Sequence, residues 1–382
     1  AYIPRGAIPK LRYLADQGYN DKHKFFVDGS PMTGDVDVAN TQNNNDKQTH
    51  NPNWRTLLVG SMGLGGKGYF ILDVTNPGFS PKPKRAWELA DQAVPSGKPN
   101  SNFSSGNASE LIIMDRTRSS NPNSDLVCDN NDTDCQKIIQ EDADIGHITA
   151  EPVRHSNDIL RSTQFAFMNN NRWAVVMGNG YNSKNQRPVL LVQYLDGTKE
   201  LLRIPAVKLK DIDTNGVGII GEGNAADNGL SSPRLVDLNG DQRPDIAYAG
   251  DNLGNMWKFD LTSYDDKDWQ VAFNGVPLFT AEGPAAYGNE GRSNPQPITV
   301  APTVRANDRM MEVGTGDDKK TVSKGGMMVA FGTGRNISKT DPQATYVQTL
   351  YGVLDNTRYK YRSGTPKRLE VHSGNSCAIT AN

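Results

Sequence analysis

The sequence has few apolar residues and no long apolar run. Only 36% of its 382 residues are hydrophobic, and no stretch approaches the roughly 18 consecutive apolar residues that a membrane-spanning helix needs. We therefore expect no direct insertion into a membrane. The formal net charge is −2 and lysine and arginine form no cluster, so the chain lacks the basic surface that nucleic-acid binding requires. DNA and RNA are set aside as partners.

Motifs of common enzymes are also missing. The chain contains no nucleophile elbow, no H-E-x-x-H motif and no Cys-x-x-Cys pair, and its five histidines are scattered. The stretch GLGGKG (63–68) fits the expression G-x-G-x-x-G, but the strand-like YFILDV follows it, where dinucleotide binding needs a helix. We expect a hairpin turn at this position and no enzymatic activity.

Cysteine is scarce, with three residues in the chain. Cys128 and Cys135 flank a short polar loop, and a disulfide between them would close it; a metal or redox pair is the alternative. A disulfide would indicate an oxidising compartment and hence export. Cys377 is left over near the end. The chain starts with AYIPRGA, without a signal peptide, so we expect a fragment of a longer exported protein.

Glycine and proline are abundant, at 37 and 22 residues, which predicts many turns and an all-β protein. Four segments share one pattern: an apolar strand that ends in glycine, a polar turn, and a second strand that ends in Leu-Asp, Phe-Asp or an equivalent pair. This pattern predicts a β-hairpin with variable insertions. The four segments are 56–77, 173–197, 245–263 and 327–356.

Further short apolar runs supply the remaining strands of each unit, at 109–115, 163–170 and 301–308. Four strands per unit, at roughly 40 to 50 residues per unit, have the proportions of a propeller. We predict one all-β domain over residues 1–382, a modified β-propeller of seven blades, or eight. Long polar loop insertions are expected at 40–53, 90–107 and 115–137, and a short helix at KIIQEDADI (137–145).

The stretch DLNGDQRPD (237–245) places oxygen-bearing side chains at regular intervals. Asp237, Asn239, Asp241 and Asp245 stand at relative positions 1, 3, 5 and 9, and the backbone carbonyl of Arg243 stands at position 7. Such hard oxygen ligands suit Ca²⁺ better than Mg²⁺, which resists dehydration. Without a cation, three carboxylates this close would repel each other. The pattern predicts a calcium site, and the alternative is a polar turn with Asx-type hydrogen bonds.

A second stretch, DIDTNGVGIIGE (211–222), also fits a calcium-loop template. Its context is poor, because strand-like and loop-like segments flank it where an EF-hand would have two helices. We keep an ordinary turn as the favoured interpretation and a second metal loop as the alternative. The candidate ligands are Asp211, Asp213, Asn215, the carbonyl of Val217, and Glu222.

The segment NGLSSPRLVDLNGDQRPDIAYAGDNLGNMWKFDL (228–261) resembles the calcium-loop segment of the PilC/PilY family of type IV pilus-associated proteins. Further similar stretches are FFVDGSPMTGDV (25–36), WRTLLVGSMGLGGKGYFILDVTNP (54–77) and VAFGTGR (329–335). The similarity spans roughly residues 1 to 360, and the overall register is most similar to the PilC proteins of Neisseria and Kingella. The resemblance implies a modified β-propeller that forms the C-terminal domain of a large exported protein.

The resemblance further implies a place at the outer membrane, the cell surface and the pilus tip. Family members promote pilus biogenesis by opposing retraction, and they act in adherence to host cells. The implied partners are minor pilins, the type IV pilus machinery and a host-cell surface receptor. Carried over to this sequence, the calcium ligands of the family are Asp237, Asn239, Asp241, the carbonyl of Arg243, and Asp245.

This sequence departs from the family pattern at Gln242, where many aspartate-rich propeller loops have glycine. An Arg-Gly-Asp motif is absent, so an integrin route is not expected. Two other functions are possible for a calcium propeller. One is a purely structural domain that docks pilus components. The other is a quinoprotein-type dehydrogenase, which would need adjacent cysteines that the sequence lacks.

Overall fold

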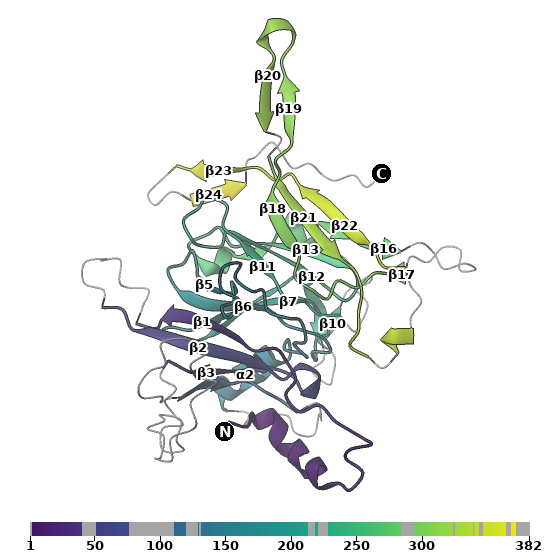
Figure 1. Ribbon diagram of the computed structural model, residues 1–382. Coiled ribbons are helices and arrows are strands. Elements are labelled where there is room, and N and C mark those ends of the chain that lie inside the picture. Colours follow the sequence, from purple (N-terminus) through teal and green to yellow (C-terminus); the bar gives the residue numbers. More distant parts are fainter. Residues whose placement is uncertain are drawn as a thin grey trace, which may run out of the picture.

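The chain folds mostly into antiparallel strands, with few short helices. The computed structural model describes residues 2–39, 51–75, 111–119, 129, 131–212, 218–220, 228–283, 294–323, 325–338, 340–343, 347–363 and 368–371. Within these residues, four sheets of three or more strands follow one another along the chain (Figure 1). No helix of the described part is long and apolar enough to cross a membrane.

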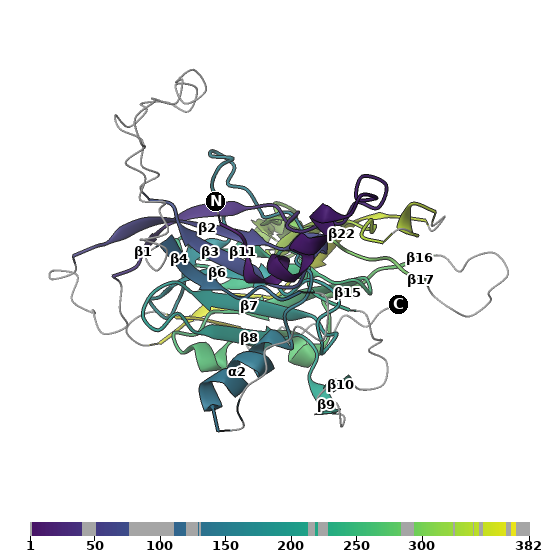
Figure 2. The ribbon, with the colours of Figure 1, turned by 90° about the horizontal axis from the view of Figure 1, so that it is seen from below.

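The first two sheets each contain four antiparallel strands in sequence order. The first sheet consists of β1 (Met32–Asp37), β2 (Trp54–Ser61), β3 (Tyr69–Asp73) and β4 (Ile112–Asp115). The second sheet consists of β5 (Phe165–Phe167), β6 (Trp173–Gly178), β7 (Val189–Tyr194) and β8 (Leu201–Pro205). Figure 2 shows β6, β7 and β8 side by side, with the helix α2 (Thr133–Asp142) next to β8.

The third and fourth sheets complete this series. The third sheet consists of β11 (Arg234–Val236), β12 (Ile246–Gly250) and β13 (Asn255–Asp260), with β14 (Gln270–Val271) and β15 (Phe279–Thr280) both paired to β13. The fourth sheet consists of β18 (Thr303–Ala306), β21 (Met327–Gly332) and β22 (Leu350–Asp355). Between β18 and β21, a hairpin of β19 (Met310–Val313) and β20 (Lys320–Ser323) projects from the body (Figure 1).

Smaller elements connect these sheets. The other two-stranded pairs are β9 (Leu209–Ile212) with β10 (Gly218–Ile220), β16 (Glu282–Gly283) with β17 (Asn294–Pro295), and β23 (Tyr359–Arg362) with β24 (Arg368–Val371). The short 3₁₀ helices are η1 (Arg5–Ala15), η2 (Gly63–Gly65), η6 (Asp266–Asp268), η7 (Phe273–Gly275), η8 (Gly316–Asp318) and η9 (Asp341–Gln343).

The second sheet is buried on both faces. Successive side chains of a strand point to opposite faces, and those of β7 alternate between two hydrophobic cores. Val189 and Leu191 pack in the core shared with the first sheet, whereas Leu190 and Val192 pack in the core shared with the third sheet. Strand β12 repeats this arrangement between the third sheet's two neighbours. A series of antiparallel sheets that pack face to face in the order of the chain is the arrangement of the blades in a β-propeller.

Strand ends carry a repeated polar device. Four strands end in an aspartate that is followed two residues later by a threonine, and the carboxylate accepts hydrogen bonds from both the backbone N–H and the hydroxyl of that threonine. The device satisfies backbone donors where the ladder stops. The four pairs are Asp73 with Thr75, Asp115 with Thr117, Asp260 with Thr262, and Asp355 with Thr357.

A buried ion pair joins the third sheet to the fourth. Lys258 of β13 is 2% exposed and its ammonium group donates to the carboxylate of Asp355 at the end of β22, which is 3% exposed. Tyr248 of β12 donates its hydroxyl to the same carboxylate, and Thr357 accepts from Lys258 at 3.1 Å. Burial alone would raise the pKa of Asp355, but Lys258 and these hydroxyls outweigh it, so the pKa lies below its ordinary value.

The four hairpins predicted from the sequence are confirmed as β2–β3, β6–β7, β12–β13 and β21–β22. The extra runs form β4, β5 and β18, the predicted helix at 137–145 lies partly within α2, and GLGGKG forms the β2–β3 turn. The all-β propeller class is thereby confirmed, while the number of blades and the single-domain assignment stay predictions. The 3₁₀ helix η1, which contains Pro9, was not among the predicted elements. Most of the expected loop insertions (40–50, 90–107, 120–128) lie outside the described residues.

Replacing Lys258 with methionine should strongly destabilise the protein. The variant Lys258→Met leaves the carboxylate of Asp355 buried without its cation, which typically costs about 3–5 kcal/mol of the free energy of unfolding. Denaturant titration followed by tryptophan fluorescence measures this loss. Lys360→Met is the matched control, because Lys360 and Glu370 form a more exposed pair at 3.1 Å and such pairs contribute under about 1 kcal/mol. Equal effects of the two substitutions would contradict the structural role of the buried pair.

Candidate functional site

The acidic loop 237–245 connects β11 to β12 in the third sheet. The two strands pair up to Val236 and Ile246, so the loop closes directly on the end of the ladder. The backbone N–H of Asp245 donates to the carbonyl of Val236 at 2.9 Å, and Leu261, just after β13, donates to the carbonyl of Asp245 at 2.9 Å. Both ends of the loop are therefore fixed by the sheet.

The outer part of the loop is a series of Asx turns. Asp237 Oδ1 accepts from the N–H of Asn239 at 3.1 Å, and Asn239 Oδ1 accepts from the N–H of Asp241 at 2.8 Å. Asp241 Oδ1 then accepts from the N–H of Arg243 at 3.0 Å. The turn that we considered as the alternative to a calcium site is thus present. Each carboxylate oxygen has further lone pairs, so these hydrogen bonds and ion binding are compatible.

Asp245 forms the buried base of the loop. It is 2% exposed, and its Oδ2 accepts from the N–H of Leu238 at 2.8 Å. Burial raises the pKa of Asp245 to about 6, and the charges of Asp241 and Asp237 add to the rise. No described lysine or arginine forms an ion pair with Asp245. The loop thus holds a buried carboxyl group whose ionisation is opposed by its own neighbours.

The departure from the family pattern at Gln242 has a structural cost. Gln242 adopts a φ of 69°, in the left-handed region that favours glycine, and Gly240 adopts a φ of 80°. The N–H of Gln242 donates to Asp237 Oδ2 at 2.7 Å. The hydrogen bond to Asp237 therefore helps to hold Gln242 in the left-handed conformation, although its side chain disfavours that conformation.

Two of three consecutive asparagines in the β5–β6 turn contact this loop, and the sequence patterns did not predict them. Asn169 is 3% exposed; its amide donates to the carbonyls of Leu261 at 2.9 Å and Pro244 at 3.1 Å, with Asp245 Oδ1 at 3.3 Å. Asn171 Oδ1 accepts from the guanidinium of Arg243 at 2.8 Å. The sequence signal was the run MNNNRW, where a strand-flanking turn has three adjacent amides.

The donor set of the loop fits Ca²⁺ in its chemistry. Three carboxylates, one amide oxygen and one carbonyl are the hard oxygen ligands that this ion prefers. The geometry gathers them incompletely: within the described residues, no group of three or more histidine, cysteine, aspartate or glutamate side chains lies close enough to hold a metal ion. Asp237, Asn239 and Asp241 are linked to one another, with Asn239 Nδ2 3.3 Å from Asp241 Oδ2, while Asp245 lies beneath them.

The other predicted site residues lie mainly outside the described residues. Asp211 belongs to β9, while Asp213, Asn215, Val217 and Glu222 are not described, so the second metal loop stays a prediction. Cys135 lies in α2 and is disulfide-bonded. Cys128 and Cys377 are outside the described residues, so the pairing of Cys135 with Cys128 also stays a prediction.

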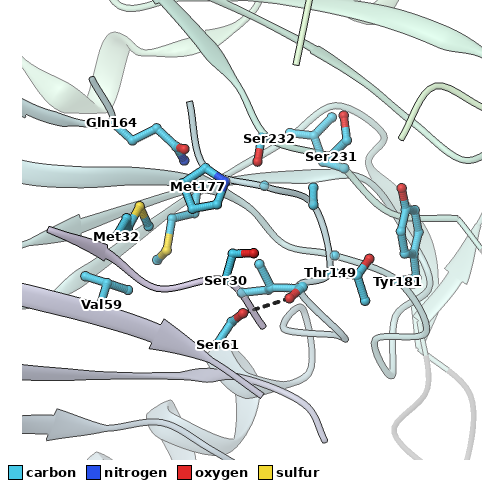
Figure 3. Close-up of a pocket in the computed structure, with 16 residues that line it drawn as sticks. Ser30, Met32, Val59, Ser61, Thr149, Gln164, Met177, Tyr181, Ser231 and Ser232 are labelled. Carbon is cyan, nitrogen blue, oxygen red and sulfur yellow. Dashed lines mark hydrogen bonds between the residues drawn. The ribbon is translucent and has the colours of Figure 1, made fainter. Parts of the chain in front are cut away.

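A small cavity lies where the first three sheets meet (Figure 3). Its volume is about 20 Å³, enough for one or two ordered water molecules. Tyr181 and Ser231 line it, and within the described residues neither hydroxyl has a hydrogen-bond partner. Ser61, also in the lining, donates to the carbonyl of Ile148 at 2.8 Å. The lining residues carry no charged side chain, and we assign the cavity no organic ligand.

The pKa of Asp245 gives the ion-free protein a specific pH dependence. The folded protein holds a proton at Asp245 up to about pH 6, whereas the unfolded chain releases it near 3.8. The folded state therefore binds more protons between these values, and its stability falls as pH rises through them. We therefore expect the melting temperature of the wild type minus that of Asp245→Asn, both measured in chelator, to be larger at pH 4 than at pH 7. A constant difference would contradict the pKa shift.

Comparison with known proteins places the chain in a family. The family model described as the PilY1 beta-propeller domain matches residues 6–106 and 159–375. The type IV pilus biogenesis factor PilY1 of Pseudomonas aeruginosa strain PAO1 is 29% identical over 388 residues, which cover 97% of this chain and 24% of the relative. A PilY1 homolog of Xylella fastidiosa is 28% identical over 361 residues, covering 93% of this chain and 18% of the relative.

A solved structure shows the same fold. The crystal structure of the Pseudomonas aeruginosa PilY1 C-terminal domain matches with a TM-score of 0.50 and 25% identity, over 90% of this chain and 52% of that one. The chain spans about a quarter or less of the length of the Pseudomonas and Xylella relatives described above. Because the family model covers most of the chain, the protein belongs to the PilY1 β-propeller family of type IV pilus proteins.

Proposed function

We propose that this chain is the β-propeller of an exported type IV pilus biogenesis protein, and that its 237–245 loop binds Ca²⁺. The relatives that it matches are named type IV pilus biogenesis factors. The observation that carries the calcium proposal is Asp245, a carboxyl group buried at the base of an aspartate-rich loop. Two further aspartates of the loop oppose its ionisation, and a bound divalent cation would remove that opposition.

The proposed ligands are Asp237, Asn239, Asp241, the carbonyl of Arg243, and Asp245. Ca²⁺ supplies positive charge that neutralises these carboxylates. Asp245 must lose its proton to act as a ligand, so calcium binding should strengthen as pH rises through about 6. The loop lies at the entrance to β12, so fixing it also fixes the end of the β12–β13 hairpin.

The proposed biological role is a binding role without catalysis. The propeller would act at the outer membrane, the cell surface and the pilus tip, promote pilus biogenesis by opposing retraction, and contribute to adhesion to host cells. The proposed partners are minor pilins, the pilus machinery and a host-cell surface receptor. The second candidate is a structural calcium propeller that only docks pilus components, which the buried, sheet-anchored position of Asp245 also supports.

Asp237→Ala should abolish calcium binding, because it removes a charged ligand that also orders the turn through Gly240 and Gln242. Isothermal titration calorimetry should show uptake by the wild type alone. Calcium should raise the melting temperature of the wild type by mass action and leave that of the variant unchanged. Asp158→Ala is the matched control, since Asp158 is an exposed aspartate whose carboxylate accepts from the N–H of Leu160 at 3.0 Å. Wild-type uptake by Asp237→Ala would place the main site elsewhere.

Partner binding separates the two candidate functions. The purified chain should capture minor pilins in a pull-down, and it should bind epithelial cells, in both cases more strongly with calcium than with chelator. Capture of minor pilins without cell binding would favour the docking propeller. A screen of glycans and cell-surface proteins, with and without calcium, would then identify the chemistry of the receptor. Absence of both interactions would contradict the proposed role.

A further inference from the structure

The two halves of the 237–245 loop are held by different parts of the molecule. The side chains of Asp237, Asn239 and Asp241 accept hydrogen bonds from the backbone of the loop itself, and Asp237 and Asp241 are exposed. The inner half, with Pro244 and Asp245, is buried. Its contacts include the turn between β5 and β6, which belongs to the second sheet. We call residues 169–171 the asparagine turn.

The side chain of Asn169 binds backbone carbonyls at and near the inner half of the loop. Its amide group donates to the carbonyl of Pro244, just before β12, and to the carbonyl of Leu261, just after β13. These two carbonyls flank the start of β12 and the end of β13, so a single buried amide bridges the base of this hairpin. Asp245 Oδ1 lies 3.3 Å from the same nitrogen. A buried donor with this many acceptors is costly to lose, because each acceptor would stay desolvated.

Arg243 is anchored to the same turn by its side chain. The guanidinium donates to Asn171 Oδ1 at 2.8 Å and to the carbonyl of Met168 at 3.2 Å, and it lies over the ring of Phe167 at 4.5 Å. The positive charge is thus directed to the second sheet, and no ion pair forms between Arg243 and an aspartate within the described residues. The carboxylates of the loop therefore remain available to an external cation.

We propose that the asparagine turn is a positioning element of the calcium site, through which calcium binding and the contact between the second and third sheets stabilise each other. The inference rests on the proposed calcium site. The turn holds the side chain of Arg243, the carbonyl of Pro244 and the carboxylate of Asp245. Binding therefore has to order only the outer half of the loop, and preorganisation of this kind increases affinity. The coupling is reciprocal: if the contact between the second and third sheets raises calcium affinity by some factor, bound calcium raises the equilibrium constant for forming that contact by the same factor.

Asn171→Gly tests the proposal with little risk to folding. Asn171 has a φ of 62°, which glycine adopts without strain, and the substitution removes the acceptor of Arg243. Loss of one hydrogen bond to a charged group should weaken calcium binding roughly tenfold. The matched control is Asn182→Gly, since Asn182 is an exposed asparagine with a φ of 58° in the β6–β7 turn of the same sheet. This control should bind calcium as the wild type does.

Hydrogen exchange of the 168–173 segment provides a second readout. Calcium should slow exchange of this segment in the wild type and leave it unchanged in Asp237→Ala. The segment lies on a different sheet from every proposed ligand, so slower exchange would report the contact between the two sheets. Asn169→Ala, with folding checked by its melting temperature in chelator, should weaken calcium binding at least as much as Asn171→Gly.

The outcomes distinguish this inference from the proposed function. Weaker calcium binding by Asn171→Gly than by Asn182→Gly, with slower exchange at 168–173 in the wild type, supports the coupling. If Asn171→Gly binds calcium as the wild type does, and calcium does not change hydrogen exchange at 168–173, the proposed coupling is overturned but the proposed calcium site is not. If the wild type takes up no calcium by calorimetry, the proposed site and the coupling are overturned together.

Discussion

Burial of a sheet on both faces is the constraint on which the rest of this structure depends. The side chains of β7 alternate between two cores, so the interior of the strand has no room for solvated polar groups. Charged and amide side chains are consequently concentrated where strands end. The Asp-x-Thr pairs, the loop after β11 and the asparagine turn after β5 all occupy such ends. The proposed calcium loop lies at such an end, whereas the strand interiors are mainly apolar and a buried charge within them, such as Lys258, has an ion-pair partner.

Features that depend on neighbouring residues could be predicted from the sequence. The hairpins follow from apolar runs of strand length on either side of a glycine-containing turn, and the structure pairs them in that register. The spacing and the oxygen-bearing residue types of 237–245 mark it as a tightly curled loop, and its outer half is organised by contacts between residues two positions apart. The departure at Gln242 was visible only through the family resemblance, and the structure gives this residue a positive φ of 69°.

Contacts between blades could not be predicted in this way. Asn169 and Pro244 are 75 residues apart in the sequence, and Lys258 and Asp355 are 97 apart. The alternation in MWKFD places Lys258 where a half-exposed strand would have a polar residue, yet it is buried, because an acidic residue of the next sheet receives it. These partners depend on which blades pack against each other, and the local sequence patterns do not show which blades are neighbours.

The strands of every sheet follow the order of the chain, from β1–β4 to β18, β21 and β22. Pairing within a blade therefore joins segments that are close in sequence, which keeps the entropy of loop closure small, whereas contacts between blades close long loops and are expected to form later. The asparagine turn precedes the acidic loop along the chain and belongs to an earlier blade. A chain that assembles blade by blade would thus have the receiving surface for the inner half of the loop in place before the loop itself arrives.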